Sequence, residues 1–537
     1  MAFFDDQRHH NLPSVIEYQV KHRPEKPWVV SGDQVFSYRD VDSLSGRLAH
    51  GLSRIGVGPE CPVLSMSKNR VEQVIIWCAL SKCNALMVPV NTHYRGSIFS
   101  YLINDSRADT ILIEPEFLQQ IADVSDELLS LKQIILIGES SDCPQEVWEQ
   151  ISDRYQIFRY ADILDDDQFS GEVPGYRDLM GIFYTSGTTG RSKGVTMTQA
   201  HAFEYARGVT QMLELRKTDV YCSPLPLFHI AGLLATIYAA GIVGASTIIV
   251  GPFSAERFWL DVNKYNVTTT FLLGAMANFI FKQRASETDP DNSLERMLMV
   301  PLMPEVEKFK KRFDCKVSTT WGGTEMNCPT QSGFELVDNK TCGRVMEDRY
   351  EVRIVDKFDR EVPNGTPGEA LVRTKVPWIV TNGYWQHPEW TVDLLRNQWI
   401  HTGDMLLKDE RGNLYFIDRT KDAIRRRGEN ISSIEVENEI NAHYQVFECA
   451  VVPIPSADTE QEVMAVVVNQ PKAGPDPEAL IQFLEPRLPY FMIPRYVRFI
   501  EALPKTPTGK VQKFVLRDNG LTEDTWDRDM SGLKLKR

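Results

Sequence analysis

The most informative stretch of this chain reads Tyr184-Thr185-Ser186-Gly187-Thr188-Thr189-Gly190-Arg191-Ser192-Lys193-Gly194. Its glycines let the backbone approach a polyanion closely and direct N–H groups toward it. Hydroxyl side chains add further donors, and Lys193 adds a positive charge. The order is not that of a Walker A loop, because Lys193 lies between Ser192 and Gly194. The stretch predicts a loop that cradles the β- and γ-phosphates of ATP, although a plain surface loop can share its composition.

The sequence before this loop alternates helix and strand patterns. Apolar residues recur every three or four positions between residues 41 and 55, which predicts a helix. An apolar strand over residues 62–65, a helix over 71–80 and a strand over 85–90 follow. This β-α-β order predicts a mostly parallel sheet with helices on its faces, and similar alternation continues to about residue 320.

The pattern changes at about residue 340. Short β-rich runs between residues 340 and 418 are separated by turn signals such as Asn382-Gly383, which predicts a β subdomain. A charged segment then opens a final region with its own strand and helix patterns. We therefore expect an α/β fold with a large N-terminal domain over residues 1–418 and a small α+β domain over residues 419–537. The boundary is expected near Lys421.

The composition is that of a soluble globular protein with a surplus of acidic groups. Of the 537 residues, 42% are hydrophobic and 25% charged, and the net charge is −14. No excess of Lys and Arg is available to neutralise phosphates along a nucleic acid, so we expect no nucleic-acid partner. Nine scattered cysteines without a C-x-x-C pair, and an N-terminus without a signal-peptide pattern, predict a cytoplasmic chain with reduced thiols.

Residues 220–255 contain no Asp, Glu, Lys or Arg. Glycines and prolines interrupt the segment, and a β-branched run, Thr247-Ile248-Ile249-Val250, lies near its end. These features predict a buried helix followed by a buried strand, and no transmembrane segment.

The Gly/Ser/Thr loop resembles the phosphate-binding signature of the adenylate-forming superfamily, which comprises acyl-CoA synthetases, peptide-synthetase adenylation domains and beetle luciferases. Other parts of that family's pattern follow in the same order between residues 180 and 515. The resemblance implies a mobile C-terminal lid domain that turns about Lys421. It also implies that the ATP phosphates contact Thr185, Ser186, Gly187, Thr188, Thr189, Gly190 and Lys193.

Trp321-Gly322-Gly323-Thr324-Glu325 resembles the family's aromatic-Gly-x-Thr-Glu motif. There the ring lies near adenine, the Thr324 hydroxyl would contact the α-phosphate, and Glu325 would hold Mg²⁺. A carboxylate suits a hard cation that bridges phosphates. Taken alone, the five residues are equally typical of a turn after a strand.

Two motifs near the expected boundary also resemble the family. In His401-Thr402-Gly403-Asp404, the carboxylate of Asp404 would accept hydrogen bonds from the ribose, although an Asp after Gly is most often a turn residue. In Asp418-Arg419-Thr420-Lys421-Asp422, Arg419 would reach the ribose or phosphates and Lys421 would be the pivot. A solvated basic linker would have a similar sequence.

The stretch Leu503-Pro504-Lys505-Thr506-Pro507-Thr508-Gly509-Lys510-Val511-Gln512-Lys513 carries the lysine that matches the family's catalytic residue. We expect this residue to be Lys510, because it alone follows a Thr-Gly pair; Lys505 and Lys513 are the alternatives. A cation between the attacking carboxylate and the α-phosphate would stabilise the charge that develops during acyl-AMP formation.

Two further stretches separate subfamilies. His229, in Pro226-Leu227-Phe228-His229, resembles the residue that lines the acyl pocket, although a lone His beside an apolar run is more often a core residue. Gly428, in Arg425-Arg426-Arg427-Gly428-Glu429-Asn430-Ile431-Ser432, resembles the loop along the pantetheine path. The basic run would attract CoA phosphates, or form a solvated charged face.

The chain also departs from the family pattern. Where many members carry a Gly-Gly-Ala-Pro-like loop, it reads Met299-Val300-Pro301-Leu302-Met303-Pro304, and Arg191-Ser192 replaces the usual x-Pro. The missing Gly-Ala loop, the stretch Ser254-Ala255-Glu256-Arg257-Phe258-Trp259 and the run Arg427-Gly428-Glu429-Asn430-Ile431-Ser432 together resemble the crotonobetaine/carnitine–CoA ligase branch most.

The resemblance implies an acid–thiol ligase that uses ATP, Mg²⁺ and coenzyme A to convert a small-molecule carboxylic acid into its acyl-AMP and then its CoA thioester. A stand-alone enzyme that loads a carrier protein, and a non-catalytic binding protein of the same fold, remain alternatives. Residues 221–232 and 271–279 contain no Asp or Glu, which favours a neutral or apolar acyl group, although aromatic rings also hold a betaine. The acid therefore stays open. A homodimer is expected from the resemblance alone.

Overall fold

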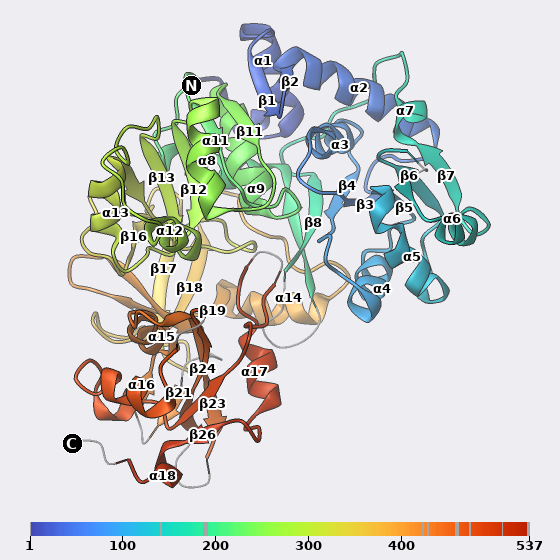
Figure 1. The fold of residues 1–537 in the computed structure, drawn as a ribbon. Helices are drawn as coiled ribbons and strands as arrows, with labels where there is room; N and C mark the ends of the chain where they lie inside the picture. Colours follow the sequence, from blue (N-terminus) through green and yellow to red (C-terminus); the bar gives the residue numbers. More distant parts are fainter. Residues whose placement is uncertain are drawn as a thin grey trace. The chain divides into compact units, whose positions relative to one another are not determined.

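The computed structural model describes residues 2–139, 142–185, 192–419, 424–426, 429–456, 461–471, 474–506 and 509–533 (Figure 1). The chain divides into two compact units. The N-terminal unit holds the described residues up to Val352 together with the segment Val372–His401, and the C-terminal unit holds Arg353–Leu371 and the described residues from Thr402 onward. These units are the two parts of the chain with the most internal contacts. The expected pivot at Lys421 lies outside the described residues.

Two seven-stranded sheets form the N-terminal unit. The first has the order β14-β13-β12-β10-β11-β1-β2 and is parallel except for β1 and β2, which pair antiparallel. Its strands are β1 (Pro27–Ser31), β2 (Gln34–Ser37), β10 (Val220–Cys222), β11 (Ser246–Ile249), β12 (Thr269–Leu273), β13 (Arg296–Val300) and β14 (Lys316–Ser318).

The second sheet has the order β7-β6-β5-β3-β4-β8-β9 and is parallel up to β8, while β9 pairs antiparallel with β8. Its strands are β3 (Pro62–Met66), β4 (Leu86–Pro89), β5 (Thr110–Ile113), β6 (Gln133–Leu136), β7 (Gln156–Arg159), β8 (Leu179–Thr185) and β9 (Lys193–Thr198). The predicted mostly parallel β-α-β architecture is thus confirmed.

Helices connect these strands. They are α1 (Leu12–His22), α2 (Tyr38–Arg54), α3 (Val71–Lys82), α4 (Gly96–Ser106), α5 (Leu118–Val124), α6 (Gln145–Ser152), α7 (Tyr160–Ile163), α8 (Gln199–Met212), α9 (Ile230–Gly232), α10 (Ala239–Val243), α11 (Ala255–Tyr265), α12 (Gly274–Phe281), α13 (Val306–Phe313) and α14 (Pro388–Leu394). The helix predicted over residues 41–55 is α2, which begins at a capping box: the hydroxyl of Ser37 accepts from the Asp40 N–H, and the Asp40 carboxylate accepts from the Ser37 N–H.

The uncharged segment 220–255 contains a buried helix followed by a buried strand, as predicted. After β10, α9 continues as a π-helix over Leu233–Tyr238 and then as α10, and the chain enters β11 after Gly244, at a φ of +77°. Each residue of these helices is buried. None of the described helices is long and apolar enough to cross a membrane.

The C-terminal unit has its own core. A sheet of order β23-β24-β25-β26 pairs β23 with β24 antiparallel and β24 with β25 parallel. Strands β21 and β22 form a separate antiparallel hairpin, and β20 precedes them in the chain. The elements are β20 (Leu414–Arg419), β21 (Ile424–Arg426), β22 (Glu429–Ile431), α15 (Ser433–Asn441), β23 (Val446–Pro455), β24 (Gln461–Asn469), α16 (Pro477–Leu484), β25 (Tyr496–Phe499), α17 (Lys513–Asn519), β26 (Trp526–Asp527) and α18 (Arg528–Ser531).

Four further strands, and then β19, lie between residues 330 and 408. They are β15 (Thr330–Gln331), β16 (Thr341–Val345), β17 (Tyr350–Val355) and β18 (Gly368–Thr374), and β19 (Ile400–Lys408) follows α14. The boundary between the compact units falls inside β17, β18 and β19. The residues between 340 and 418 are therefore shared between the two units.

Candidate active site

Several predicted motifs of the N-terminal unit follow the ends of parallel strands. Strands β10, β12, β13 and β14 run in the same direction in one sheet, so their carboxyl ends share one edge. The segments that leave this edge are residues 223–232, 274–279, 301–304 and 319–325. Ligands of open α/β sheets bind at such an edge, outside the carboxyl ends of the strands.

The phosphate loop joins two paired strands. Strand β8 ends at Thr185, β9 begins at Lys193, and these two residues lie opposite each other in the ladder. The Thr185 hydroxyl donates to the carbonyl of Lys193 at 3.4 Å. A Cβ on Gly194 would lie 2.8 Å from the Ile182 side chain, which explains the glycine there. Ser186, Gly187, Thr188, Thr189 and Gly190 lie outside the described residues, so their contacts with phosphates stay predictions.

Aromatic rings surround the Lys193 ammonium group. Its Nζ lies 4.8 Å from the ring centroid of Tyr384 and 5.4 Å from that of Trp390. At these distances, the negative face of an aromatic ring attracts a cation. The side chain of Lys193 is therefore directed by α14 and by the segment that precedes it.

The motif after β14 forms a tight turn. The Trp321 N–H donates to the Thr330 hydroxyl at 2.8 Å, and the Gly323 N–H donates to the carbonyl of Asn327 at 2.9 Å. A Cβ on Gly322 would lie 2.1 Å from that same carbonyl oxygen, so only glycine fits. Trp321 is 5% exposed and Thr324 is half-buried. The motif is thus a turn after a strand, as the alternative interpretation predicted, and the contacts of its residues with a ligand stay predictions.

Glu325 is held from residues 381–384. Its carbonyl accepts from the Thr381 N–H at 2.9 Å, and its Oε1 accepts from the Tyr384 hydroxyl at 3.0 Å. The side chain is half-buried. Since Tyr384 also contacts Lys193, this residue brings together two site residues that the sequence predicted separately. Sequence analysis missed Tyr384, because Asn382-Gly383 was interpreted only as a turn; an aromatic residue directly after that turn was the available signal.

His229 caps the short helix α9. Its Nδ1 accepts from the Ala231 N–H at 3.1 Å, and the side chain is half-buried. The turn before it is clamped by Asn69, whose amide donates to the Leu225 carbonyl at 3.1 Å and accepts from the Leu227 N–H at 2.9 Å. Sequence analysis missed this asparagine, which no motif marks. The capping hydrogen bond fixes the tautomer, since Nδ1 must be unprotonated to accept.

The two stretches predicted to line the acyl pocket lie side by side. Strands β10 and β12 pair in register, and the Ser223 hydroxyl donates to the Phe271 carbonyl at 3.0 Å. A Cβ on Gly274 would lie 2.4 Å from the carbonyl oxygen of Pro301. The start of α12 therefore contacts the segment that replaces the family's Gly-Gly-Ala-Pro-like loop.

In the C-terminal unit, the structure joins Asp404 and Arg419. They lie opposite each other in the antiparallel pair β19–β20, and Arg419 Nε is 2.8 Å from Asp404 Oδ1. The Asp404 side chain is 5% exposed, and the Arg419 side chain is 36% exposed. Gly403 adopts a φ of +67°, which favours glycine in the turn before the carboxylate. Two residues predicted to contact the ribose thus form one ion pair.

Lys510 lies on an exposed turn. The Thr506 N–H donates to its carbonyl at 2.7 Å, and Gly509 has a φ of +79°. The two alternative lysines are held by carboxylates: Lys505 pairs with Glu448, and Lys513 pairs with Glu437 at 2.7 Å. The assignment of the catalytic role to Lys510 stays a prediction from the resemblance.

The basic run after the expected pivot is not a uniformly solvated face. Arg426 is buried at 2% exposure and pairs with Glu462, which is equally buried, at 2.7 Å. Its Nη1 donates to the Phe491 carbonyl at 2.9 Å. The interpretation of this run as open to CoA phosphates or to solvent is therefore wrong for Arg426. Lys421 and Gly428 lie outside the described residues.

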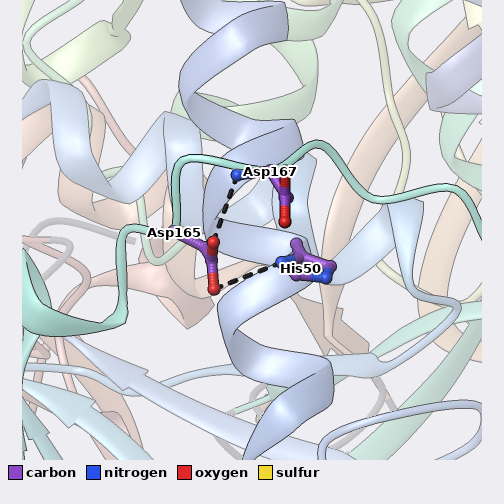
Figure 2. A group of neighbouring side chains, drawn as sticks. All are labelled: His50, Asp165 and Asp167. Atoms are coloured by element: carbon purple, nitrogen blue, oxygen red, sulfur yellow. Dashed lines mark hydrogen bonds and ion pairs between the residues drawn. The ribbon is translucent and has the colours of Figure 1, made fainter.

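A different cluster resembles a metal site only superficially. Figure 2 shows His50, Asp165 and Asp167, and their ligand atoms lie within 4.8 Å of one another. Both carboxylate oxygens of Asp165 already have partners, because Oδ1 accepts from the Asp167 N–H and Oδ2 pairs with Arg54 at 2.5 Å. These contacts lower the pKa of Asp165 to about 2, the backbone hydrogen bond contributing most. The Arg54 guanidinium thus supplies the positive charge that a metal ion would otherwise supply at Asp165.

Comparisons with known proteins identify the family to which these motifs belong. The family of AMP-binding enzymes matches residues 16–385, and the AMP-binding enzyme C-terminal domain matches residues 435–510. The crotonobetaine/carnitine–CoA ligases of Salmonella heidelberg and Citrobacter koseri are each 29% identical over 489 residues, which is 89% of this chain and 92% of the relative.

Solved structures show the same fold. The anthranilate CoA ligase AuaEII in complex with anthranoyl-AMP superposes with a TM-score of 0.85 at 23% identity, covering 97% of this chain and 99% of that one. ATP-bound MatB from Rhodopseudomonas palustris superposes with a TM-score of 0.80 at 25% identity, covering 94% and 98%.

The chain belongs to the family of AMP-binding enzymes, because that match spans more than half of its length. The resemblance to adenylate-forming enzymes is therefore confirmed, and the crotonobetaine/carnitine–CoA ligases are among its curated relatives. The predicted α/β fold with a smaller C-terminal domain is confirmed as well.

Proposed function

We propose that this enzyme is an ATP-dependent carboxylate–CoA ligase. It joins an organic acid to AMP with release of pyrophosphate, and then transfers the acyl group to the thiol of coenzyme A. The observation that carries the proposal is the meeting of Lys193 and Glu325 at Tyr384. A cation for the phosphates and a carboxylate for a hard metal ion lie around one ring, next to the strand ends where a ligand binds.

Glu325 fits the magnesium ion that the proposal requires. Mg²⁺ prefers oxygen ligands and is usually held by one or two carboxylates together with phosphate oxygens and water. The half-buried carboxylate of Glu325 is oriented through Oε1 by the Tyr384 hydroxyl. When bound, the ion would neutralise charge on the phosphates.

The chain's own residues supply the remaining chemistry. Lys193 would hold the β- and γ-phosphates, and the Thr324 hydroxyl would donate to the α-phosphate. Asp404 and Arg419 would orient the ribose. Lys510, exposed on its turn, would stabilise the negative charge that develops when the substrate carboxylate attacks the α-phosphorus. The oxygen of the acid then forms a bond to phosphorus while pyrophosphate leaves.

The second half-reaction requires a different arrangement of the lid. We infer that the lid turns about Lys421 and brings Gly428 toward the pantetheine arm, where the thiol attacks the acyl carbonyl and AMP leaves. His229 would line the acyl pocket beside this path. Curated relatives that are named CoA ligases support coenzyme A as the acceptor.

We propose that the acid belongs to the class of neutral, apolar or betaine-type carboxylates. Residues 221–232 and 271–279, which lie side by side after β10 and along β12, contain no Asp or Glu. The relatives named crotonobetaine/carnitine–CoA ligases favour the betaine type. A cationic betaine head would then be held by aromatic faces rather than by a carboxylate. From the resemblance alone, we also propose that the enzyme is a homodimer. Sedimentation analysis, which measures the mass of the particle in solution, tests this proposal.

The decisive experiment measures pyrophosphate release with ATP·Mg²⁺ and a panel of acids, with and without CoA. The panel includes betaine-type, short aliphatic, medium-chain and aromatic carboxylates. Release that requires one acid class, with thioester formed from CoA, supports the proposal and identifies the substrate. Release without thioester would indicate carrier-protein loading. No release with any acid would contradict the proposal and favour a non-catalytic binding protein.

Two variants locate the chemistry within this assay. Lys510→Ala should lower acyl-AMP formation by roughly a hundredfold or more, the usual effect of removing a group that stabilises transition-state charge. Lys505→Ala is the matched control, because Lys505 is already paired with Glu448. An unchanged rate for Lys510→Ala would refute the role of this lysine.

A further inference from the structure

Tyr384 contacts two groups with different tasks in the proposed reaction. Its ring centroid lies 4.8 Å from Lys193 Nζ, and its hydroxyl donates to Glu325 Oε1 at 3.0 Å. Lys193 comes from the start of β9, and Glu325 from the turn after β14. One side chain thus joins the edges of two separate sheets.

The position of this ring is fixed from both sides. On the side of β9, the Thr196 N–H donates to the Gly383 carbonyl at 3.0 Å, and the Trp385 N–H donates to the Gly194 carbonyl at 2.7 Å. On the side of α14, the Tyr384 N–H donates to the Thr391 hydroxyl at 2.9 Å. The backbone around Tyr384 is therefore tied to the strand that carries Lys193.

Helix α14 adds a second ring to the lysine. Trp390, on this helix, lies 5.4 Å from Lys193 Nζ. It stacks on His387 with ring centroids 3.7 Å apart, and His387 in turn pairs with Asp105 at 2.8 Å. Trp390 is thus held by His387 as well as by Tyr384, whose ring meets it edge-on at a centroid distance of 6.4 Å.

The two parts of the tyrosine act on different partners. The ring face attracts the lysine cation, and the lysine is thereby kept extended over the aromatic surface. The hydroxyl donates to only one oxygen of the Glu325 carboxylate, which orients the other oxygen for a second ligand. Hydrogen bonds of this kind orient metal ligands and commonly change metal affinity tenfold or more when removed.

We propose that Tyr384 is a positioning residue that couples the phosphate-binding lysine to the metal-binding carboxylate, with its hydroxyl setting Mg²⁺ affinity and its ring, together with Trp390, setting ATP affinity. This inference rests on the proposed function, since it assumes that Lys193 binds phosphate and Glu325 binds Mg²⁺. It adds a coupling residue to a site that is otherwise made of the predicted motifs.

The test is ATP binding by titration calorimetry to the full chain at varied Mg²⁺, without any acid. Tyr384→Phe keeps the ring and removes the hydroxyl, so the Mg²⁺ concentration for half-maximal enhancement of ATP binding should rise roughly tenfold. ATP affinity at saturating Mg²⁺ should change by less than threefold. Trp390→Leu should change the other quantity: ATP should bind roughly threefold to tenfold more weakly, and the Mg²⁺ concentration for half-maximal enhancement should stay the same.

Tyr265 on α11 provides a matched control. Its ring lies 4.7 Å from Lys264 Nζ and its hydroxyl donates to the Gly32 carbonyl at 3.4 Å, so it has the same two kinds of contact without a motif residue as partner. Tyr265→Phe should change neither quantity. A thermal melt of each variant shows whether the fold is retained.

The outcomes separate this inference from the proposed function. A wild-type Mg²⁺ midpoint in Tyr384→Phe, or equal effects of Tyr384→Phe and Trp390→Leu on both quantities, overturns the inference. Absence of pyrophosphate release from the wild-type enzyme, with ATP·Mg²⁺ still bound, overturns the proposed function alone. Absence of ATP binding to the wild-type enzyme overturns both.

Discussion

The buried pair Arg426–Glu462 makes a prediction about the stability of the C-terminal unit. The two side chains are 2% and 3% exposed, their charged atoms are 2.7 Å apart, and Arg426 also donates to the carbonyls of Phe491 and Ile493. Arg426→Met leaves the Glu462 carboxylate and these carbonyls buried without the guanidinium. Breaking a buried pair by removing one partner costs about 3–5 kcal/mol of unfolding free energy.

The double variant Arg426→Met/Glu462→Met distinguishes charge burial from lost packing. Replacing a buried pair by apolar side chains of similar volume is often close to neutral, so most of the loss should be recovered. An exposed pair provides the control: Arg487, 44% exposed, lies 3.2 Å from Glu439, and Arg487→Met should cost about 1 kcal/mol or less.

Hydrogen exchange of peptides from β23 and β24 measures this stability locally, in the unit that contains the pair. The expected order is wild type close to the double variant, with Arg426→Met far less protected. A loss below about 1 kcal/mol in Arg426→Met, or a double variant as unstable as the single one, would refute the assignment of this arginine to the core.

Three further variants test other features of the structure. His201 is fully buried, and burial lowers its pKa to about 3, so between pH 6.5 and 3 the unfolded chain binds a proton that the folded chain does not. Between pH 7 and pH 5 this group lowers the unfolding free energy of the wild type by about 2 kcal/mol. Denaturant titrations at the two pH values should therefore show a change in His201→Leu that is less destabilising than that of the wild type by about this amount. Gly322→Ala places a Cβ 2.1 Å from the Asn327 carbonyl, which should distort the motif turn and abolish ATP binding by calorimetry, whereas Gly58→Ala, with open space around it, should not. Asp404→Asn removes the negative charge opposite Arg419 and one acceptor for the ribose, so the KM for ATP in the pyrophosphate assay should rise roughly tenfold. A KM equal to that of the wild type would contradict this role of Asp404.

Much of the architecture was predictable because it depends on local patterns. The helical spacing over residues 41–55 and the uncharged segment 220–255 reflect which faces are buried, and periodicity reports burial directly. The motif around Trp321 was identified by its resemblance to the family's aromatic-Gly-x-Thr-Glu motif, and the structure shows why Gly322 stands there: no other residue fits against Asn327.

The sequence alone was sufficient to predict the α/β class from its helix and strand patterns. Its resemblance to a known family identified the order of the motifs and Lys193, Glu325 and Lys510 as candidates, because each motif consists of residue types within a few positions of one another. Only the tertiary structure shows that Tyr384 joins Lys193 to Glu325, and that Arg426 is buried against Glu462 rather than solvated. These contacts connect residues far apart in the chain. Strand pairing and side-chain packing decide them, and a local pattern of charge or hydrophobicity does not encode which distant partner a side chain meets.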